Sequence, residues 1–259
     1  MIHGGRDHCR NWDWVAQALR DDFHIIAPDL RGHGDSAWAV GGSYMLRDFV
    51  YDIAQLVRQR TMAPLSIIAH SMGGFISSLY TGVFPETVSR LVIVDGIVHS
   101  PPEIKAMADI PCDERLTQWI GMMRDLSGRS AKKYKSLEEA IARMHGENSR
   151  LSTEQALALT IHGVNQNEDG TYSWKFDNYV RTVTIDAMDL NDVTSLWQRI
   201  SCPTLLINGE ESFVSNPATN GTLAYFKNAR SELVAGAGHW VHHDKLNEFL
   251  ALVRPFLKN

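Results

Sequence analysis

Cysteine is scarce in this sequence, and the close cysteine pairs that bind metal or form redox centres are missing. Only three of the 259 residues are cysteine, namely Cys9, Cys112 and Cys202, and they lie far apart. An odd and scattered set of this kind favours free thiols in a reducing compartment over a disulfide framework. We therefore expect a cytoplasmic protein.

A strong net charge and long apolar runs are also lacking. The chain has 25 Lys and Arg against 30 Asp and Glu, a net charge of −5, which argues against nucleic acid as a partner. No run approaches the roughly 20 apolar residues of a membrane-spanning helix, and Met1–Gly5 does not begin a signal peptide. We expect a small-molecule substrate as the partner, and neither nucleic acid nor a membrane.

What the sequence does contain is an alternation of strand and helix patterns. Runs typical of buried strands occupy residues 24–30, 64–70, 91–95, 203–208 and 231–234. Helical periodicity marks residues 11–19, 48–60, 72–83 and the stretch that begins at Asp244. This alternation predicts an α/β fold, a mostly parallel sheet with helices on both faces.

The alternation stops between residues 98 and 198. This segment has the pattern of helices and loops, with no convincing strand, and residues 165–173 are polar and loop-like. Two capping-box patterns predict helix starts inside it: Ser136 with Glu139, and Ser152 with Gln155. We therefore predict a core of residues 1–97 and 199–259 and an inserted helical cap of residues 98–198.

The strongest chemical signal is the stretch Ala69–Gly74, of sequence AHSMGG, between a predicted strand and a predicted helix. A tight strand-to-helix turn exposes a serine at the carboxyl edge of a sheet, and small neighbours allow the backbones to approach. A serine hydroxyl becomes a good nucleophile only when a base can take its proton. We predict Ser71 as a nucleophile.

A candidate base follows the last predicted strand. His239 lies on the loop 236–243, from which a side chain can reach the carboxyl edge of the same sheet. His242 and His243 are close by, but no HExxH pattern accompanies them, so we predict no metal site. His239 is the predicted general base.

Two glycine-rich stretches require an interpretation. In His3–Arg6, of sequence HGGR, the backbone N–H of Gly5, together with that of Met72, could bind a developing oxyanion. Residues 32–37 match G-x-G-x-x-A, but the loop-like sequence that follows does not begin the helix that a dinucleotide site needs. We predict an oxyanion hole at Gly5 and Met72, and no cofactor.

Taken together, these motifs resemble those of the α/β-hydrolase superfamily along the whole chain, and within it the sequence is similar to capped esterase-like, dehalogenase-like and luciferase-like members. The matching pieces, in order, are residues 3–5, 29–36, 69–74, 202–206 and 238–239. The resemblance implies the α/β-hydrolase fold and a serine hydrolase with a catalytic triad. It also implies that strands preceding the His-Gly motif in relatives are missing here, so that the sheet loses an edge. Dehalogenases and epoxide hydrolases carry aspartate in place of Ser71, which argues against both activities.

The resemblance leaves two candidates for the third member of the triad. Many relatives carry the acid three residues after the glycine that ends strand seven, but that position is Ser212 here, and Glu211 lies one residue short. Asp95, at the tip of strand six, occupies a position that some relatives use. Either carboxylate could orient His239, and we favour Asp95.

The predicted reaction is hydrolysis of an ester-like bond in a small, apolar substrate through an acyl-enzyme intermediate. Carbon–carbon bond hydrolysis with the same triad is the alternative, as is a non-catalytic ligand-binding protein on a hydrolase scaffold. Several large side chains in the predicted cap suggest an apolar pocket: Trp119, Met122, Met123, Trp174 and Tyr179.

Overall fold

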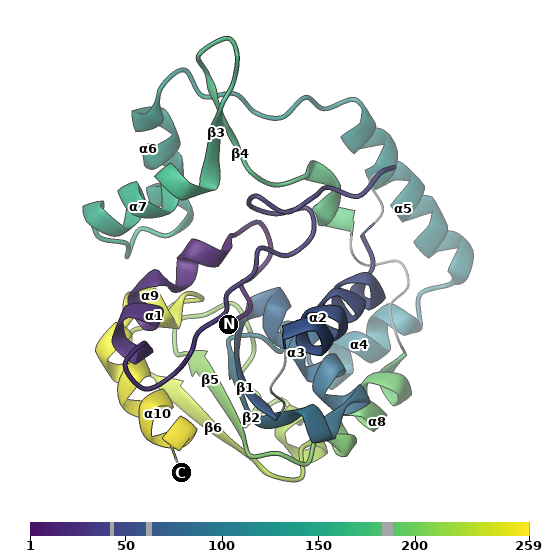
Figure 1. The fold of residues 1–259 in the computed structure, drawn as a ribbon. Helices are drawn as coiled ribbons and strands as arrows, with labels where there is room; N and C mark the ends of the chain where they lie inside the picture. The colour runs from purple at the N-terminus through teal and green to yellow at the C-terminus, as the bar shows by residue number, and fades with distance from the viewer. Residues whose placement is uncertain (42–43, 61–63, 183–188, 259) are drawn as a thin grey trace.

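The computed structural model describes residues 1–41, 44–60, 64–182 and 189–258, and it is built around a parallel sheet (Figure 1). Four strands pair in the order β1-β2-β5-β6, with every pairing parallel. They are β1 (Leu65–His70), β2 (Val88–Val94), β5 (Thr204–Gly209) and β6 (Ala229–Val234). The predicted parallel α/β sheet is therefore confirmed, and the loops at its carboxyl edge follow residues 70, 94, 209 and 234.

Helices cover both faces of the sheet. Along β1, Ile67 and Ala69 pack into one hydrophobic cluster, whereas Ile68 between them packs into a second, because alternate residues of a strand point to opposite faces. The first cluster holds residues of α2 (Leu46–Arg60), α3 (Ser71–Val83) and α8 (Leu190–Arg199). The second holds residues of α1 (Asp13–Leu19) and α10 (Leu246–Lys258).

The remaining helices in the described part of the chain are either single short turns of the core or parts of the segment 98–198. They are η1 (Cys9–Trp12), η2 (Pro85–Thr87), α4 (Pro101–Ala108), α5 (Cys112–Ser127), α6 (Leu137–Glu147), α7 (Thr153–Gly163), η3 (Asn178–Thr182), η4 (Thr222–Tyr225) and α9 (Val241–Asp244). Nowhere among the described residues is there a helix with both the length and the apolar character to cross a bilayer.

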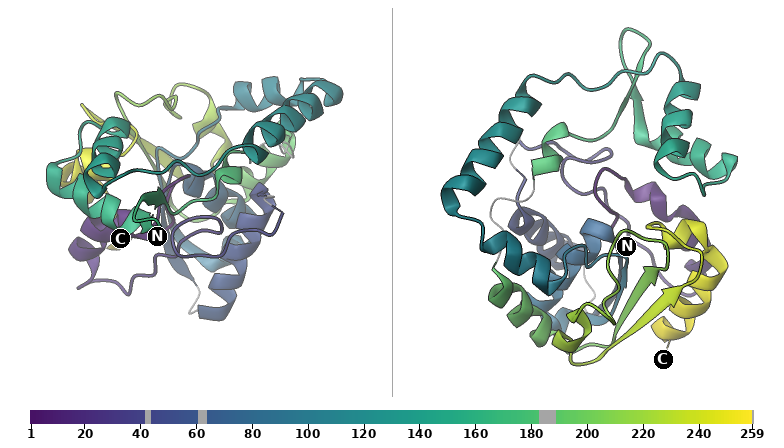
Figure 2. Two further views of the ribbon diagram at one scale, coloured as in Figure 1. Left: turned by 90° about the horizontal axis from the view of Figure 1, so that it is seen from above. Right: turned by 180° about the vertical axis from the view of Figure 1, so that it is seen from behind.

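Within the segment 98–198, α5, α6 and α7 extend away from the sheet, and Figures 1 and 2 show α5 standing apart from the pair α6 and α7. At its carboxyl end, α8 packs against α3, and Trp197 of α8 is fully buried and donates a hydrogen bond from Nε1 to Ser78 Oγ at 2.9 Å. This helix is therefore part of the main hydrophobic core, although it falls inside the predicted cap.

The prediction that residues 98–198 contain no strand was wrong. Strands β3 (Val164–Gln166) and β4 (Tyr172–Trp174) form an antiparallel hairpin, and Tyr134 pairs with Tyr172 along its outer side. Each strand has only three residues, too few for an alternating pattern to stand out from the polar turn between them. The hairpin instead gains its stability from packing with Tyr134, Leu137 and Ala140.

A second prediction was wrong at residues 24–30, which form no strand. This stretch is extended, but the described residues form no ladder of backbone hydrogen bonds along it, and its contact with residue 1 is the hydrogen bond from the Met1 ammonium to the Ile26 carbonyl oxygen, at 2.6 Å. Ile2 in turn pairs in parallel with Ala69 of β1. A strand needs a hydrogen-bonded ladder, which residues 24–30 lack in the described structure.

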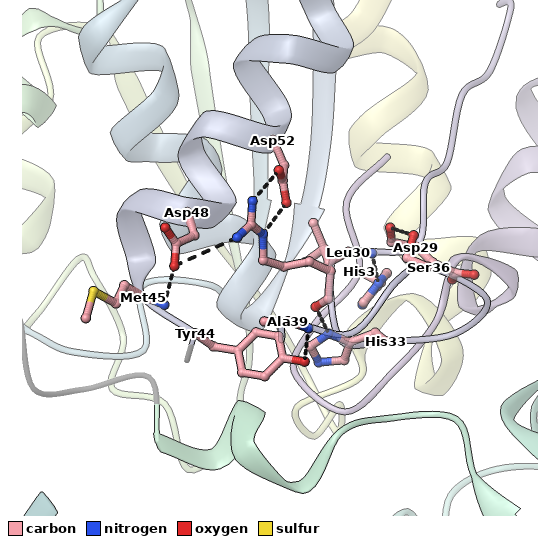
Figure 3. Close-up of polar contacts among 11 residues, drawn as sticks. His3, Asp29, Leu30, His33, Ser36, Ala39, Tyr44, Met45, Asp48 and Asp52 are labelled. Carbon is pink, nitrogen blue, oxygen red and sulfur yellow. Dashed lines mark hydrogen bonds and ion pairs between the residues drawn. The ribbon is translucent and has the colours of Figure 1, made fainter. Parts of the chain in front are cut away.

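The loop after this stretch is a polar scaffold, shown in Figure 3. The Asp29 carboxylate accepts hydrogen bonds from the backbone N–H groups of Cys9, at 2.6 Å, and Asp35, at 2.9 Å. The Leu30 N–H donates to His3 Nε2 at 2.9 Å, and the Arg31 guanidinium binds the Asp52 carboxylate with two hydrogen bonds of 2.6 Å. These contacts tie the loop 29–36 to the start of the chain and to α2, and so fix the His3–Arg6 stretch beside the sheet.

Candidate active site

Ser71 lies at a tight turn between β1 and α3. It is the first residue of α3 and has a φ of 50°, a left-handed conformation that a non-glycine residue adopts only under strain. Gly73 allows this turn, since a Cβ at that position would lie 2.3 Å from the His3 carbonyl oxygen. The predicted strand-turn-helix context of Ser71 is therefore present, with its hydroxyl at the carboxyl edge of the sheet.

The structure brings Ser71, His239 and Asp95 into one hydrogen-bonded chain. His239 Nε2 lies 2.9 Å from Ser71 Oγ, and His239 Nδ1 lies 2.6 Å from Asp95 Oδ2. The Nδ1–H can donate to the carboxylate, which leaves Nε2 with a lone pair to accept the serine proton. Only 9% of the His239 side chain and none of the Asp95 side chain is exposed, so little water competes for these hydrogen bonds.

Asp95 is held from several directions at the tip of β2. Like Ser71 it has a positive φ, 48°. Its Oδ1 accepts hydrogen bonds from Asn208 Nδ2, at 2.9 Å, and from the Gly209 N–H, at 3.3 Å, while Ser212 Oγ donates to Oδ2. These donors supply the hydrogen bonds that a fully buried carboxyl group needs. Asn208 and Ser212 were not predicted in this role, because only the pairing of β2 with β5 brings them to Asp95.

Glu211, the other candidate acid, points elsewhere. Its carboxylate forms an ion pair with Arg150 of the segment 98–198, and about half of its side chain, 54%, is exposed. No hydrogen bond joins Glu211 to His239 among the described residues. The structure therefore places Asp95 at the imidazole and Glu211 at the wall of the cleft.

Gly5 and Met72 lie side by side next to the serine. A Cβ on Gly5 would be 3.6 Å from the Met72 sulfur, and both residues line the same cavity as Ser71. The Met72 N–H is in the first turn of α3, where a helix offers its N–H groups no internal acceptor. The Gly5 N–H likewise has no hydrogen-bond acceptor among the described residues. Two N–H groups are thus available to an oxygen atom beside Ser71.

Buried histidines lie next to Ser71, His239 and Asp95, and their hydrogen bonds fix the loop that carries His239. His70 Nε2–H donates to the His239 carbonyl oxygen at 2.9 Å, and His242 Nε2–H donates to Asn11 Oδ1 at 2.5 Å. Burial lowers the pKa of both rings well below the usual value for histidine, and the neighbouring histidines lower it further. His70 and His242 are therefore neutral near pH 7 and act as fixed supports.

A cavity of about 710 Å³ opens above the serine, between the carboxyl edge of the sheet and the segment 98–198. Its lining combines aromatic groups such as Trp174, Phe176 and Phe213 with several charged ones. Of the five large side chains that suggested an apolar pocket, only Trp174 lines it, whereas Met122 on α5 is exposed to solvent. The pocket is therefore mixed in character.

The sequence as a whole matches the family model described as Alpha/beta hydrolase family over residues 1–252. This chain belongs to the alpha/beta hydrolase family. It is 25% identical to the esterase Rv0045c of Mycobacterium tuberculosis, over 99% of this chain and 81% of that protein. It is also 25% identical to the esterase YbfF of Escherichia coli, over 100% of this chain and 92% of that protein.

Solved structures show the same fold. A thioesterase domain from the curacin biosynthetic pathway superposes with a TM-score of 0.83 at 23% identity, covering 98% of this chain and 89% of that domain. This alpha/beta hydrolase thus has esterase-like relatives.

The site of this alpha/beta hydrolase does not resemble a metal or dinucleotide centre. No group of three or more metal-ligating side chains gathers anywhere in the described ranges. The glycine pattern at residues 32–37 packs on its own chain, since a Cβ at Gly34 would lie 2.1 Å from the Asp29 carboxyl carbon. The three cysteines are free thiols, as the sequence predicts.

Proposed function

We propose that this protein is a serine hydrolase that cleaves an ester-like bond through an acyl-enzyme intermediate. The observation that carries the proposal is the hydrogen-bonded chain from Ser71 Oγ through His239 to Asp95. A nucleophile, a base and an acid in this order can perform acyl transfer without a cofactor. The esterase-like relatives support the same chemistry.

In the proposed first step, Ser71 Oγ attacks the substrate carbonyl carbon while His239 Nε2 takes the hydroxyl proton. The carbonyl oxygen becomes an oxyanion and accepts hydrogen bonds from the N–H groups of Gly5 and Met72. His239, now an imidazolium next to the Asp95 carboxylate, returns the proton to the leaving alcohol. The carbon–oxygen bond of the ester breaks, and the acyl group remains on Ser71.

In the second step, water replaces the alcohol. His239 takes a proton from the water, whose oxygen attacks the acyl carbon, and the same N–H groups hold the oxyanion. The proton passes to Ser71 Oγ as the acid product leaves. In this proposal the segment 98–198 acts as a cap, because its residues form the outer wall of the cavity and so limit which substrates reach Ser71.

A fluorophosphonate probe and a simple ester test the proposal. The wild-type protein should become labelled at Ser71 and hydrolyse 4-nitrophenyl butyrate, whereas Ser71→Ala should do neither beyond a trace. Loss of the triad serine costs about 10⁶-fold in turnover in related mechanisms. A wild-type protein that is folded but neither labelled nor active would support the alternative of a ligand-binding protein on a hydrolase scaffold.

A further inference from the structure

The cavity above Ser71 carries more positive than negative charge. Its cationic lining residues are Arg6, Lys132, Arg143, Arg150 and Arg181. Two of these have carboxylate partners, because Arg143 pairs with Glu147 and Arg150 pairs with Glu211. Within the described ranges no carboxylate forms an ion pair with Arg6, Lys132 or Arg181. The cavity therefore holds three cations that form no ion pair with any carboxylate in the described part of the chain.

The remaining acidic group of the lining does little to offset them. Asp7 is the third carboxylate of the cavity wall, and burial raises its pKa to about 7. Its oxygens accept hydrogen bonds from the His8 N–H, at 2.8 Å, and from Asn11 Nδ2. Asp7 is thus only partly ionised at neutral pH, and its side chain is turned toward η1 rather than toward the arginines.

The backbone at Arg6 is under strain of the kind found at functional positions. Arg6 has a φ of 60°, and among the described non-glycine residues only Ser71 and Asp95 also have a positive φ. Such strained conformations cluster at active sites and at positions that hold ligands. Arg6 directly follows Gly5 in the sequence, and both residues line the cavity that contains Ser71.

Arg181 lines the same cavity and comes from η3. Its guanidinium lies over the Phe176 ring, 5.4 Å from the ring centroid, which restricts its orientation. Burial lowers the pKa of Arg181, and the positive charges of Arg6, Arg129 and Arg143 act in the same direction, opposed by Glu147. Arginines that lie in one cavity repel one another as long as no anion is bound. A bound anion offsets this repulsion, so such a cluster favours anion binding.

We propose that Arg6 and Arg181 together bind an anionic group, a carboxylate or a phosphate, which the substrate carries near its scissile carbonyl. The inference rests on the proposed hydrolase function and narrows its substrate class to esters that carry an anionic group. A guanidinium matches both carboxylate and phosphate through paired N–H donors. The aromatic residues of the lining would then contact the uncharged part of the substrate.

Matched ester pairs test this inference. The first pair is 4-nitrophenyl hemiglutarate and 4-nitrophenyl butyrate, which places the charge on the acyl side. The second pair is 4-acetoxybenzoate and its methyl ester, which places the charge on the leaving group. The readout is the ratio of kcat/KM for the anionic ester to kcat/KM for the neutral ester. Competition by glutarate or by inorganic phosphate against 4-nitrophenyl butyrate then distinguishes a carboxylate from a phosphate as the preferred anion.

Arg6→Gln and Arg181→Gln should each lower this ratio about tenfold in at least one pair, the size of one charge-assisted hydrogen bond. The loss should appear mainly in KM, it should shrink in high salt, and Arg6→Lys should restore part of it. Arg20→Gln, which removes an exposed charge beyond the end of α1, is the control and should leave the ratio unchanged.

Two results distinguish the failure of this inference from the failure of the hydrolase proposal. If neither ester of either pair is cleaved in a Ser71-dependent manner, the hydrolase proposal itself falls. If the neutral esters are cleaved but the ratio is the same in wild type, Arg6→Gln and Arg181→Gln for both pairs, the anion site is refuted and the hydrolase proposal stands.

Discussion

Asp95 and His239 are 144 positions apart in the sequence, yet their side chains meet at 2.6 Å. A buried carboxylate is stable there only because three donors besides the imidazole reach its oxygens, those of Asn208, Gly209 and Ser212. The same oxygen, Oδ2, faces both His239 Nδ1 and Ser212 Oγ. A single residue at the tip of β2 therefore connects the loop after β5 to the proposed base.

This geometry predicts unequal effects for the two candidate acids. Asp95→Asn keeps the shape but removes the charge that fixes the His239 tautomer, and we expect kcat for 4-nitrophenyl butyrate to fall by about 10⁴-fold. Glu211→Gln should lower kcat less than about threefold, because Glu211 contacts Arg150 rather than His239. Steady-state kinetics at one pH test both, with circular dichroism to show that each variant is folded. A large loss in Glu211→Gln together with an active Asp95→Asn would transfer the acid role to Glu211.

Of the proposed catalytic residues, the nucleophile and the base could be predicted from short sequence motifs, whereas the acid could not be decided between two candidates. Ser71 and His239 lie in short motifs whose spacing to the neighbouring strands is visible in the sequence. The sequence favoured Asp95 over Glu211 but could not exclude either, because both follow a predicted strand and both could reach the histidine. The deciding contacts depend on how β2 pairs with β5 and on Arg150, which approaches Glu211 from 61 positions away. Arg6 gave no sequence signal, since its strained backbone appears only in the structure.

The element that positions the nucleophile is the junction of β1 and α3, and its geometry depends on close contact with the start of the chain. Gly73 in the first turn of α3 faces residues 2 and 3, with the His3 carbonyl oxygen 2.3 Å from where a Cβ would lie. The contact is with backbone, which cannot rotate away as a side chain can. The junction therefore tolerates only glycine at position 73.

Gly73→Ala should consequently destabilise the protein by about 1–3 kcal/mol, the usual cost of overpacking, and should lower kcat by displacing Ser71. Gly121→Ala is the matched control, since Gly121 lies within α5 and a Cβ there has no atom within 4 Å. That change should stabilise the protein by roughly 0.5–1 kcal/mol through helix propensity. Urea unfolding of the two variants measures both effects. Equal stability in Gly73→Ala and wild type would show that the junction can shift.

Elements were predicted well where periodicity was long and poorly where it was short. The capping box of Ser152 and Gln155 is complete at α7, with reciprocal hydrogen bonds of 2.9 and 3.1 Å. At α6, Ser136 accepts from the Glu139 N–H, but the Glu139 carboxylate accepts from the Lys135 N–H rather than closing the box. The hairpin β3–β4 was not predicted, and residues 24–30 were wrongly predicted to form a strand. Both outcomes depend on whether another segment pairs with the backbone, which a local sequence pattern does not show.

On the scale of the whole molecule, six buried histidines gather around the site and along the start of the chain, and four of them have a pKa far below the usual value. These four are His3, His70, His242 and His243, each no more than 6% exposed. Burial lowers the pKa of His3 and of His243 to about 3, and that of His70 and His242 well below the usual value. The folded protein therefore keeps these rings neutral at a pH at which the unfolded chain protonates them.

This difference predicts a loss of stability in acid. Below about pH 6.5 the unfolded chain binds protons that the folded protein does not, so the free energy of unfolding should fall with pH, and for His243 the fall should continue toward pH 3. The buried Asp7 acts in the opposite direction, since its pKa of about 7 lets the folded protein bind a proton that the unfolded chain releases above about pH 4. Asp7 is the same in wild type and in a variant that differs only at one histidine, so its contribution cancels when their free energies of unfolding are compared.

His243→Phe isolates one of these histidines. Neither ring nitrogen of His243 has a hydrogen-bond partner among the described residues, and its ring packs edge-on against Trp14 with centroids 5.5 Å apart. Phenylalanine can keep this packing and has no proton to bind, so at pH 7.5 the variant should be at least as stable as wild type. At pH 5 the unfolded wild-type chain gains about 2 kcal/mol from protonating this one residue, and the variant should be more stable by about that amount. Urea unfolding at the two pH values measures the difference, with Gly121→Ala as a control whose pH dependence should parallel that of wild type. If His243→Phe and wild type lose stability equally between pH 7.5 and 5, the ring is protonated in the folded protein, and burial does not hold it neutral.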